Sequence, residues 1–217
     1  MPAGTIAPSA DTTGDYWIFY PVGVINKRDE ITTSGTYTAT VTGWYKITVK
    51  GGGGGGYGGA HDSSLAVTSY GGGEGGTTIC FEKMTAGQSA SVVIGAGGTG
   101  GPGLKNSSIS QAGTVGGNST VTVNGNTYTG GGGGVRSGGT GTIPGASGSI
   151  GFSTNSTTIQ VTGGSGGGAG GGVYGSDGVY GGGGAAGTAQ ISVDMATNGG
   201  NGGDGFVWFE YWDPSLQ

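Results

Sequence analysis

The segment Trp44-Tyr45-Lys46-Ile47-Thr48-Val49-Lys50 leads without interruption into six glycines at residues 51–56, and this junction decides the fold. Tyr45, Ile47 and Val49 occupy alternate positions, as on the buried face of a strand. Glycine supplies 60 of the 217 residues, and similar runs follow other strand-like segments. The further runs are residues 71–73, 130–134, 166–168, 170–172 and 181–184. The glycines therefore belong to a fold rather than to a linker.

Glycine runs are costly to order, because glycine loses more backbone entropy on folding than any other residue and has no side chain to bury. We therefore expect the runs to be held by backbone hydrogen bonds and close main-chain packing. Bundled polyglycine II helices, with three residues per turn, are one arrangement that satisfies both conditions. The alternative is that the runs are flexible loops between strands.

The strand-like segments predict an all-β fold, a sandwich or a jelly roll with glycine-rich loops. Apolar residues show no helical spacing over any useful window. The sequence Asn124-Gly125 between two strand-like segments predicts a type I′ hairpin turn. The predicted strands are residues 16–20, 36–41, 44–49, 77–81, 89–94, 119–123, 157–161, 189–193 and 206–212.

Composition excludes several classes of protein. A net charge of −5 with only 9% charged residues argues against nucleic-acid binding, which needs a basic surface. The single cysteine, Cys80, excludes an intrachain disulfide and reads as a small core residue. The first residues lack a signal-peptide pattern and no run is long enough to span a bilayer, so we expect synthesis in a cytosol without membrane insertion.

Variable segments between the glycine runs are the expected binding loops: residues 57–70, 103–112, 135–159, 173–180 and 188–198. Aromatic rings beside glycine runs can stack on sugars or anchor protein contacts. The alternatives are rings that cover glycine backbone and charges that are merely solvated. The candidate receptor-binding residues are Tyr57, His61, Asp62, Tyr70, Arg136, Tyr174, Asp177 and Tyr180.

Two motifs suggest ligands but lack the required context. Residues 95–100 match G-x-G-x-x-G after a strand, yet Pro102 follows where a helix should begin, and no acidic residue is placed to bind a ribose. Residues 199–207 match one calcium-binding nonapeptide, but this architecture shares each ion between successive copies and no second copy is present. We therefore expect no cofactor and no metal.

Catalysis is equally weakly indicated. His61 and Asp62 lie beside Ser63 and Ser64, but neighbours on one loop cannot easily orient one another as nucleophile, base and orienting group. His61 is the only histidine, which excludes a histidine-rich metal site. We expect a protein that binds without catalysing a reaction.

Three segments resemble the glycine-rich distal domains of bacteriophage tail fibres. They are TYTATVTGWYKITVKG at residues 36–51, MTAGQSASVVIGAGG at 84–98 with GGNST at 116–120, and GDGFVWFEYWDP at 203–214. The resemblance covers residues 33–217. It implies a β-sandwich at a fibre tip whose variable loops recognise a receptor on the bacterial surface, either an outer-surface protein or a glycan.

The resemblance also implies an assembly. Residues 1–32, with Tyr16-Trp17-Ile18-Phe19-Tyr20, are expected to attach the domain to other tail-fibre proteins or to form the first strand of the sandwich. We expect a homotrimer in the virion, with a monomeric tip as the alternative. The competing functions are a fibre connector or decoration protein without a receptor of its own, and an ice-binding protein. Irregular glycine spacing argues against the ice-binding function.

Overall fold

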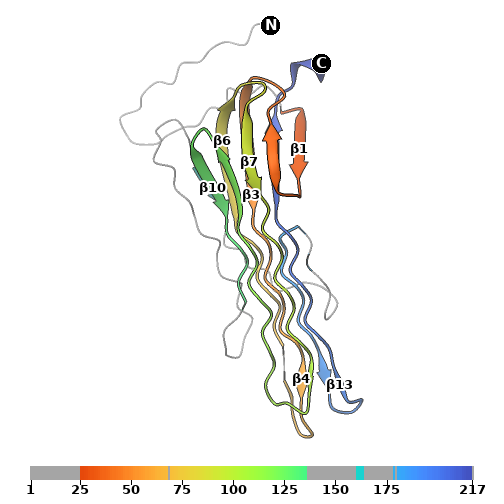
Figure 1. Ribbon diagram of the computed structural model, residues 1–217. Helices are drawn as coiled ribbons and strands as arrows, with labels where there is room; N and C mark the ends of the chain where they lie inside the picture. Colours follow the sequence, from red (N-terminus) through yellow and green to blue (C-terminus); the bar gives the residue numbers. More distant parts are fainter. Residues whose placement is uncertain (1–24, 68, 136–159, 164–177, 179, 217) are drawn as a thin grey trace, which may run out of the picture.

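The protein is an all-β molecule with a sandwich at one end and a long bundle of extended glycine-rich segments at the other (Figure 1). The computed structural model describes residues 25–67, 69–135, 160–163, 178 and 180–216. Within these ranges the only helical element is a single 3₁₀ turn, Pro214–Leu216. The all-β sandwich predicted from the alternating strands is confirmed.

Two sheets form the sandwich. The first has the order β1-β14-β3-β6-β11 and the second the order β10-β9-β7-β2, with every neighbouring pair antiparallel. The strands of the first sheet are β1 (Lys27–Ile31), β14 (Phe206–Tyr211), β3 (Gly43–Lys50), β6 (Thr77–Met84) and β11 (Gln160–Gly163). Those of the second are β10 (Asn126–Gly130), β9 (Ser119–Val123), β7 (Ser89–Val93) and β2 (Gly35–Thr38).

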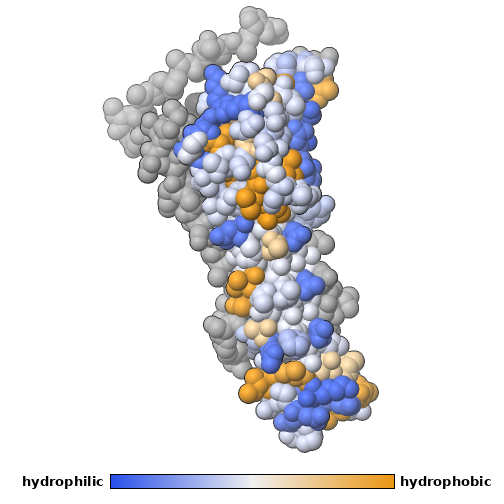
Figure 2. Space-filling model, viewed as in Figure 1, coloured by the Kyte–Doolittle hydropathy of each residue, from blue (hydrophilic) through white to orange (hydrophobic). Residues whose placement is uncertain are grey.

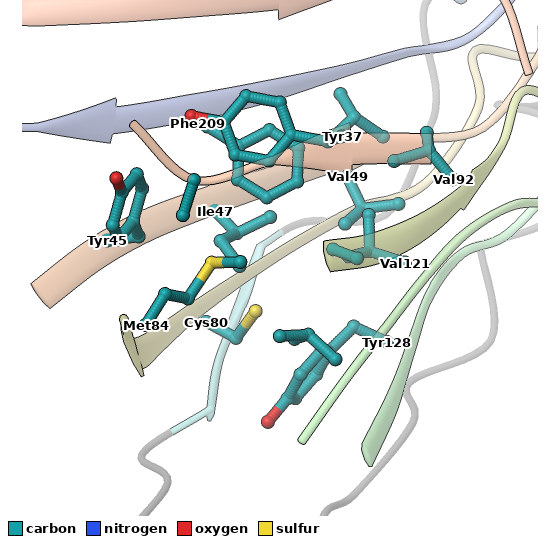
Figure 3. Packing of buried hydrophobic residues seen from close by; sticks show 14 of the residues in the cluster. Tyr37, Tyr45, Ile47, Val49, Cys80, Met84, Val92, Val121, Tyr128 and Phe209 are labelled. Atoms are coloured by element: carbon teal, nitrogen blue, oxygen red, sulfur yellow. The ribbon is translucent and has the colours of Figure 1, made fainter. Parts of the chain in front are cut away.

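The core lies between the two sheets and consists largely of aromatic and β-branched side chains (Figure 3). Tyr45, Ile47 and Val49 of β3 are completely buried, as their alternate spacing predicts. Tyr37 from the second sheet stacks on Phe209 from the first, with ring centroids 3.7 Å apart and nearly parallel planes. This ring pair links the two sheets.

Cys80 and Glu82 of β6 also face the core. Burial raises the pKa of the Cys80 thiol, so the residue is the buried core cysteine that the sequence predicts. The Glu82 carboxylate accepts hydrogen bonds from the Tyr128 hydroxyl and from the side-chain amides of Asn124 and Asn126. These bonds satisfy a carboxylate that would otherwise be costly to bury.

The glycine bundle is organised around one segment, residues 51–59, which we call the central segment. Its N–H groups donate in rotation to three neighbouring segments, residues 70–76, 111–117 and 197–203. The nine bonds, donor first, are Gly51–Gly76, Gly52–Gly117, Gly53–Gly203, Gly54–Gly73, Gly55–Thr114, Gly56–Gly200, Tyr57–Tyr70, Gly58–Gln111 and Gly59–Thr197, with N···O distances of 2.7–3.0 Å. Every third N–H group of the central segment therefore donates to the same neighbouring segment.

The carbonyl groups of the central segment accept from three further segments. Bonds come from residues 98–104, from residues 184–187 and from Gly133. A period of three residues per turn, with bonds to neighbouring segments only, is the pattern expected of extended left-handed helices. The runs at 51–56, 71–73, 130–134 and 181–184 are therefore ordered by backbone hydrogen bonds, and their dihedral assignment as polyglycine II helices stays a prediction. The runs at 166–168 and 170–172 lie outside the described residues.

Glycine is required in the bundle because the backbones lie too close for a side chain. A Cβ atom added at Gly53 would lie 2.0 Å from the carbonyl oxygen of Gly182, and one added at Gly132 would lie 1.9 Å from that of Gly116. Real Cβ atoms do not approach backbone this closely. The alternative of flexible glycine loops is wrong for these runs.

The predicted strands agree with the structure in most places. The hairpin at Asn124-Gly125 is confirmed, with φ values of 52° and 76° at its two central residues. The strand predicted at 189–193 is shorter, since β12 ends at Gln190 and a turn follows. Residues 16–20 and 157–159 lie outside the described residues.

The N-terminal segment contains the first strand of the sandwich, one of the two roles expected of residues 1–32. Strand β1 lies within residues 1–32 and pairs along its whole length with β14, so the sandwich begins before residue 33. Asp29 of β1 accepts hydrogen bonds from the hydroxyl groups of Tyr37 and Tyr211 at 3.0 and 2.9 Å. The charged sequence of β1 hides this strand, because its inward carboxylate takes the place of an apolar side chain.

Candidate functional site: the distal tip

The bundle ends in a small cap, here called the distal tip, at the end of the molecule opposite to the C-terminus (Figure 1). It contains β4 (Ala60–His61), β5 (Ala66–Val67), β8 (Leu104–Lys105), β12 (Ala189–Gln190) and β13 (Met195–Ala196). Strand β4 pairs with β5 and β8, and it contacts both β12 and β13. Three of the five predicted binding loops, from segments 57–70, 103–112 and 188–198, therefore meet here.

Exposed aliphatic side chains characterise the distal tip. Leu65 is 51% exposed, Ile109 72% and Val193 61%, and Ile191 is 40% exposed. They come from all three loops and alternate with charged and hydroxyl side chains, so that apolar and polar patches lie side by side at this end (Figure 2). Apolar groups gathered on an otherwise polar surface are typical of interaction sites.

Short polar contacts fix the loops beneath these side chains. Asp62 accepts hydrogen bonds from the backbone N–H groups of Ser64 and Leu65, both at 2.7 Å, and from the Ser64 hydroxyl at 2.9 Å. These bonds hold the pKa of Asp62 below its usual range. In the second loop the Ser107 N–H donates to the His61 carbonyl at 2.9 Å. The loop that carries Leu65 is therefore preorganised.

Asp194 joins the third loop to the other two. Its carboxylate lies 3.0 Å from Lys105 Nζ and 3.4 Å from His61 Nε2. The His61 ring is buried at 4% exposure, and its Nδ1 lies 3.3 Å from the Asp62 carbonyl oxygen. His61 was expected to contact the receptor, but its ring is buried. Its contacts with Ser107 and Asp194 instead hold the other two loops against its own.

The predicted aromatic residues that the structure describes lie away from the exposed aliphatic side chains of the distal tip. Tyr57 and Tyr70 are half-buried within the bundle, where their rings meet edge to face at a centroid distance of 6.2 Å. Tyr180 lies near the sandwich, beside Phe206. The five predicted residues that the structure describes therefore do not form one surface. Arg136, Tyr174 and Asp177 lie outside the described residues.

The aliphatic residues of the tip were missed by the sequence analysis, which favoured aromatic rings. One signal was present: Ile109 lies inside a polar segment without a neighbouring strand pattern, whereas Val193 ends a predicted strand and Leu65 is followed by Ala66 and Val67. An isolated apolar residue in a polar loop has no core to join, which favours an exposed position. The identity of the three loops that converge depends on long-range backbone pairing, which glycine runs do not encode.

The two weak ligand motifs have structural roles. The glycines at 95–100 lie within the bundle, where Gly97 N–H donates to Asp204 Oδ1 at 2.8 Å and Gly100 N–H donates to Asn201 Oδ1 at 2.9 Å. Two side chains of the nonapeptide at 199–207 therefore accept hydrogen bonds from the backbone of the G-x-G-x-x-G motif at 95–100. In the described part of the chain no cluster of three acidic, histidine or cysteine side chains could hold a metal ion.

Over the described residues, no helix is both long enough and apolar enough to cross a membrane. No protein-family model matches the chain, and no curated protein shows significant similarity to it.

Proposed function

We propose that this chain is a receptor-binding tip protein of a bacteriophage tail fibre, which recognises the surface of a bacterium through the distal tip. One observation carries the proposal: three separate loops are brought together at the end of a long bundle and expose aliphatic side chains there. The resemblance of residues 33–217 to glycine-rich fibre-tip domains supports the same function. Binding, not catalysis, is the activity we propose.

The bundle suits this function because it makes the loops rigid. Each central-segment residue from Gly51 to Gly59 donates a backbone hydrogen bond to a neighbouring segment. Loops that are ordered before binding lose less conformational entropy when a receptor is bound. The length of the bundle also carries the loops away from the sandwich (Figure 1). A sequence change in a loop can then alter specificity without disturbing the fold.

The remaining parts of the proposal concern assembly. Other tail-fibre proteins are proposed as partners at the sandwich end, and the virion as the location. A homotrimer is proposed, with a monomeric tip as the alternative. The second candidate function is a structural connector or decoration protein, in which the aliphatic side chains of the tip would fill an interface with another virion protein.

A strain panel tests the proposed function. The purified, fluorescently labelled full-length chain is incubated with intact bacteria of many strains, including mutants that lack surface proteins or polysaccharides, and its mass in solution is measured on the same sample. We expect binding to some strains and not to others, and loss of binding in the mutant that lacks the receptor. A folded protein that binds no strain would favour the connector function.

A matched pair of variants locates the binding surface. Val193 at the tip and Val115 on the side of the bundle are 61% and 63% exposed, so Val193→Asp and Val115→Asp introduce the same charge at equal exposure. Both should keep the wild-type melting temperature, because exposed substitutions change stability by about 0.5 kcal/mol or less. We expect only Val193→Asp to lose cell binding. Equal loss in both variants, or in neither, would contradict the assignment of the tip.

A further inference from the structure

A second candidate site lies at the junction of the sandwich and the bundle, far from the tip. It is a cavity of about 600 Å³ on the outer face of the first sheet, within the range of about 300–1,000 Å³ typical of small-molecule sites. The lining residues used below are Arg28, Glu30, Lys50, Glu74, Tyr180, Phe206 and Trp208. We call this cavity the junction pocket.

The sheet register explains why these residues meet. Trp208 of β14 lies opposite Glu30 of β1 on one side, and Phe206 lies opposite Lys50 of β3 on the other. Residues two apart on a strand share a face, so Phe206 and Trp208 lie together, with ring centroids 4.4 Å apart. The opposite face of β14 packs into the core. The pocket floor is therefore aromatic and is fixed by the sheet.

Tyr180 forms one wall of the junction pocket in an unusual conformation. Its φ is +49° and that of Gly181 is +75°, so a bulky residue is held in the left-handed region. Such residues cost free energy and concentrate at ligand clamps and active sites. The ring is 62% exposed and meets the edge of Phe206 at a centroid distance of 6.0 Å. The chain thus holds an exposed aromatic ring beside an aromatic floor.

Charged groups surround the rings in equal numbers of each sign. The Arg28 guanidinium lies over the Trp208 ring, 4.4 Å from its centroid, and Lys50 pairs with Glu74. Glu30 is the second carboxylate. Two cations and two carboxylates give a neutral site that offers both hydrogen-bond donors and acceptors. A neutral ligand with several hydroxyl groups can bond charged groups of both signs at once, which neither a simple anion nor a hydrocarbon chain can do.

We propose that the junction pocket binds a short neutral saccharide, whose apolar ring face packs on the exposed Tyr180 ring beside Trp208 while its hydroxyl groups bond the charged side chains around them. Aromatic rings beside hydrogen-bonding groups of both kinds match the two chemical faces of a sugar. This second binding site is independent of the function proposed for the distal tip.

Titration with defined sugars tests the proposal. Lactose, maltose, cellobiose and chitobiose, with sialyllactose as the anionic comparison, are titrated into the full chain at up to about 20 mM. Binding is followed by calorimetry and by the NMR signal of the Trp208 indole, assigned with a Trp208→Phe variant. We expect at least one neutral disaccharide to bind and to shift the Trp208 signal. Absence of binding by all four, or tighter binding of sialyllactose than of lactose, would overturn the proposal.

Variants at Tyr180 locate the sugar. Tyr180→Ala should weaken binding by about fivefold, since one aromatic contact is lost, whereas Tyr180→Phe should restore most of the affinity. Val115→Asp on the side of the bundle should bind the sugar as tightly as the wild type does. Full affinity in Tyr180→Ala, measured on a sample with an unchanged melting temperature, would overturn the assignment of the junction pocket.

Discussion

Substitution of a single central glycine by alanine should weaken the whole bundle, as the surroundings of Gly53 show. The new Cβ would lie 2.0 Å from the carbonyl oxygen of Gly182, whereas ordinary contact begins at 3.4 Å, so one backbone must move by about 1.4 Å. Gly182 accepts from Gly203 N–H, and Gly53 itself donates to the Gly203 carbonyl and accepts from Gly98. A shift of this size strains three hydrogen bonds at once.

The expected loss of stability is large. Overpacking typically costs about 1–3 kcal/mol, and each strained hydrogen bond contributes about 1 kcal/mol. We therefore expect Gly53→Ala to lower the free energy of unfolding by about 4–6 kcal/mol, which corresponds to a fall of about 8–24 °C in the melting temperature of a chain of this length. Thermal unfolding by circular dichroism, with hydrogen exchange of residues 51–59, measures both the global and the local effect.

Gly35→Ala is the matched control. Gly35 lies in β2, its φ is outside the left-handed region, and an added Cβ would meet nothing within 4 Å. Its replacement should leave stability unchanged or raise it by up to about 1 kcal/mol, because alanine restricts the unfolded chain. Equal melting temperatures for Gly53→Ala and Gly35→Ala would refute the argument that the bundle packs backbone to backbone.

Three further predictions concern single side chains. Glu82→Ala removes the carboxylate that accepts hydrogen bonds from the buried Tyr128 hydroxyl and from two asparagine amides. It should lower the free energy of unfolding by about 2–3 kcal/mol in denaturant titrations, and a loss no greater than that of Glu82→Gln would contradict this role. The Cys80 thiol is completely buried, and burial raises its pKa. It should therefore react with a thiol reagent only as fast as the protein unfolds. Rapid labelling of the native protein at neutral pH would contradict this burial. Hydrogen bonds from Ser64 and Ser215 lower the pKa values of the Asp62 and Asp213 carboxyls from 3.8, so the stabilising effect of these bonds is complete above about pH 4 and is lost as the pH falls through the lowered values. The exchange-protection factors of the Ser64 and Ser215 amides should therefore fall in this range. Constant protection factors between pH 5 and about pH 2 would contradict the assignment.

Most of the sandwich could be predicted because alternation survives in its strands. The apolar residues of β3 and β14 point inward at every second position, and Asn124-Gly125 marks the hairpin between β9 and β10. Strand β1 was missed because Lys27–Ile31 carries four charged residues among five, and its inward group is the carboxylate of Asp29. Polar groups that are satisfied inside a protein interrupt the hydrophobic pattern on which such predictions depend.

The sequence predicts that the glycine runs are held by backbone hydrogen bonds, but it does not predict which segments pair. The entropy of glycine requires backbone hydrogen bonds, yet nothing in a run of identical residues shows that Gly51 pairs with Gly76 or Gly52 with Gly117. Which loops meet at the tip follows from these pairings, so the loops were predicted individually and their convergence was not. The glycine run beside Tyr180 marks its ring as a candidate contact, but the place of that ring at the junction depends on the register of β14 and β3.

Hydrogen exchange on a bound sample tests the central claim most directly. The full chain is incubated with cell envelopes of a strain that it binds, and amide exchange is compared with that of the free protein. We predict new protection at residues 62–65, 106–110 and 191–194, with the amides of β2 and β7 unchanged. Protection confined to the sandwich, with the three loops exchanging as in the free protein, would contradict receptor recognition by the distal tip.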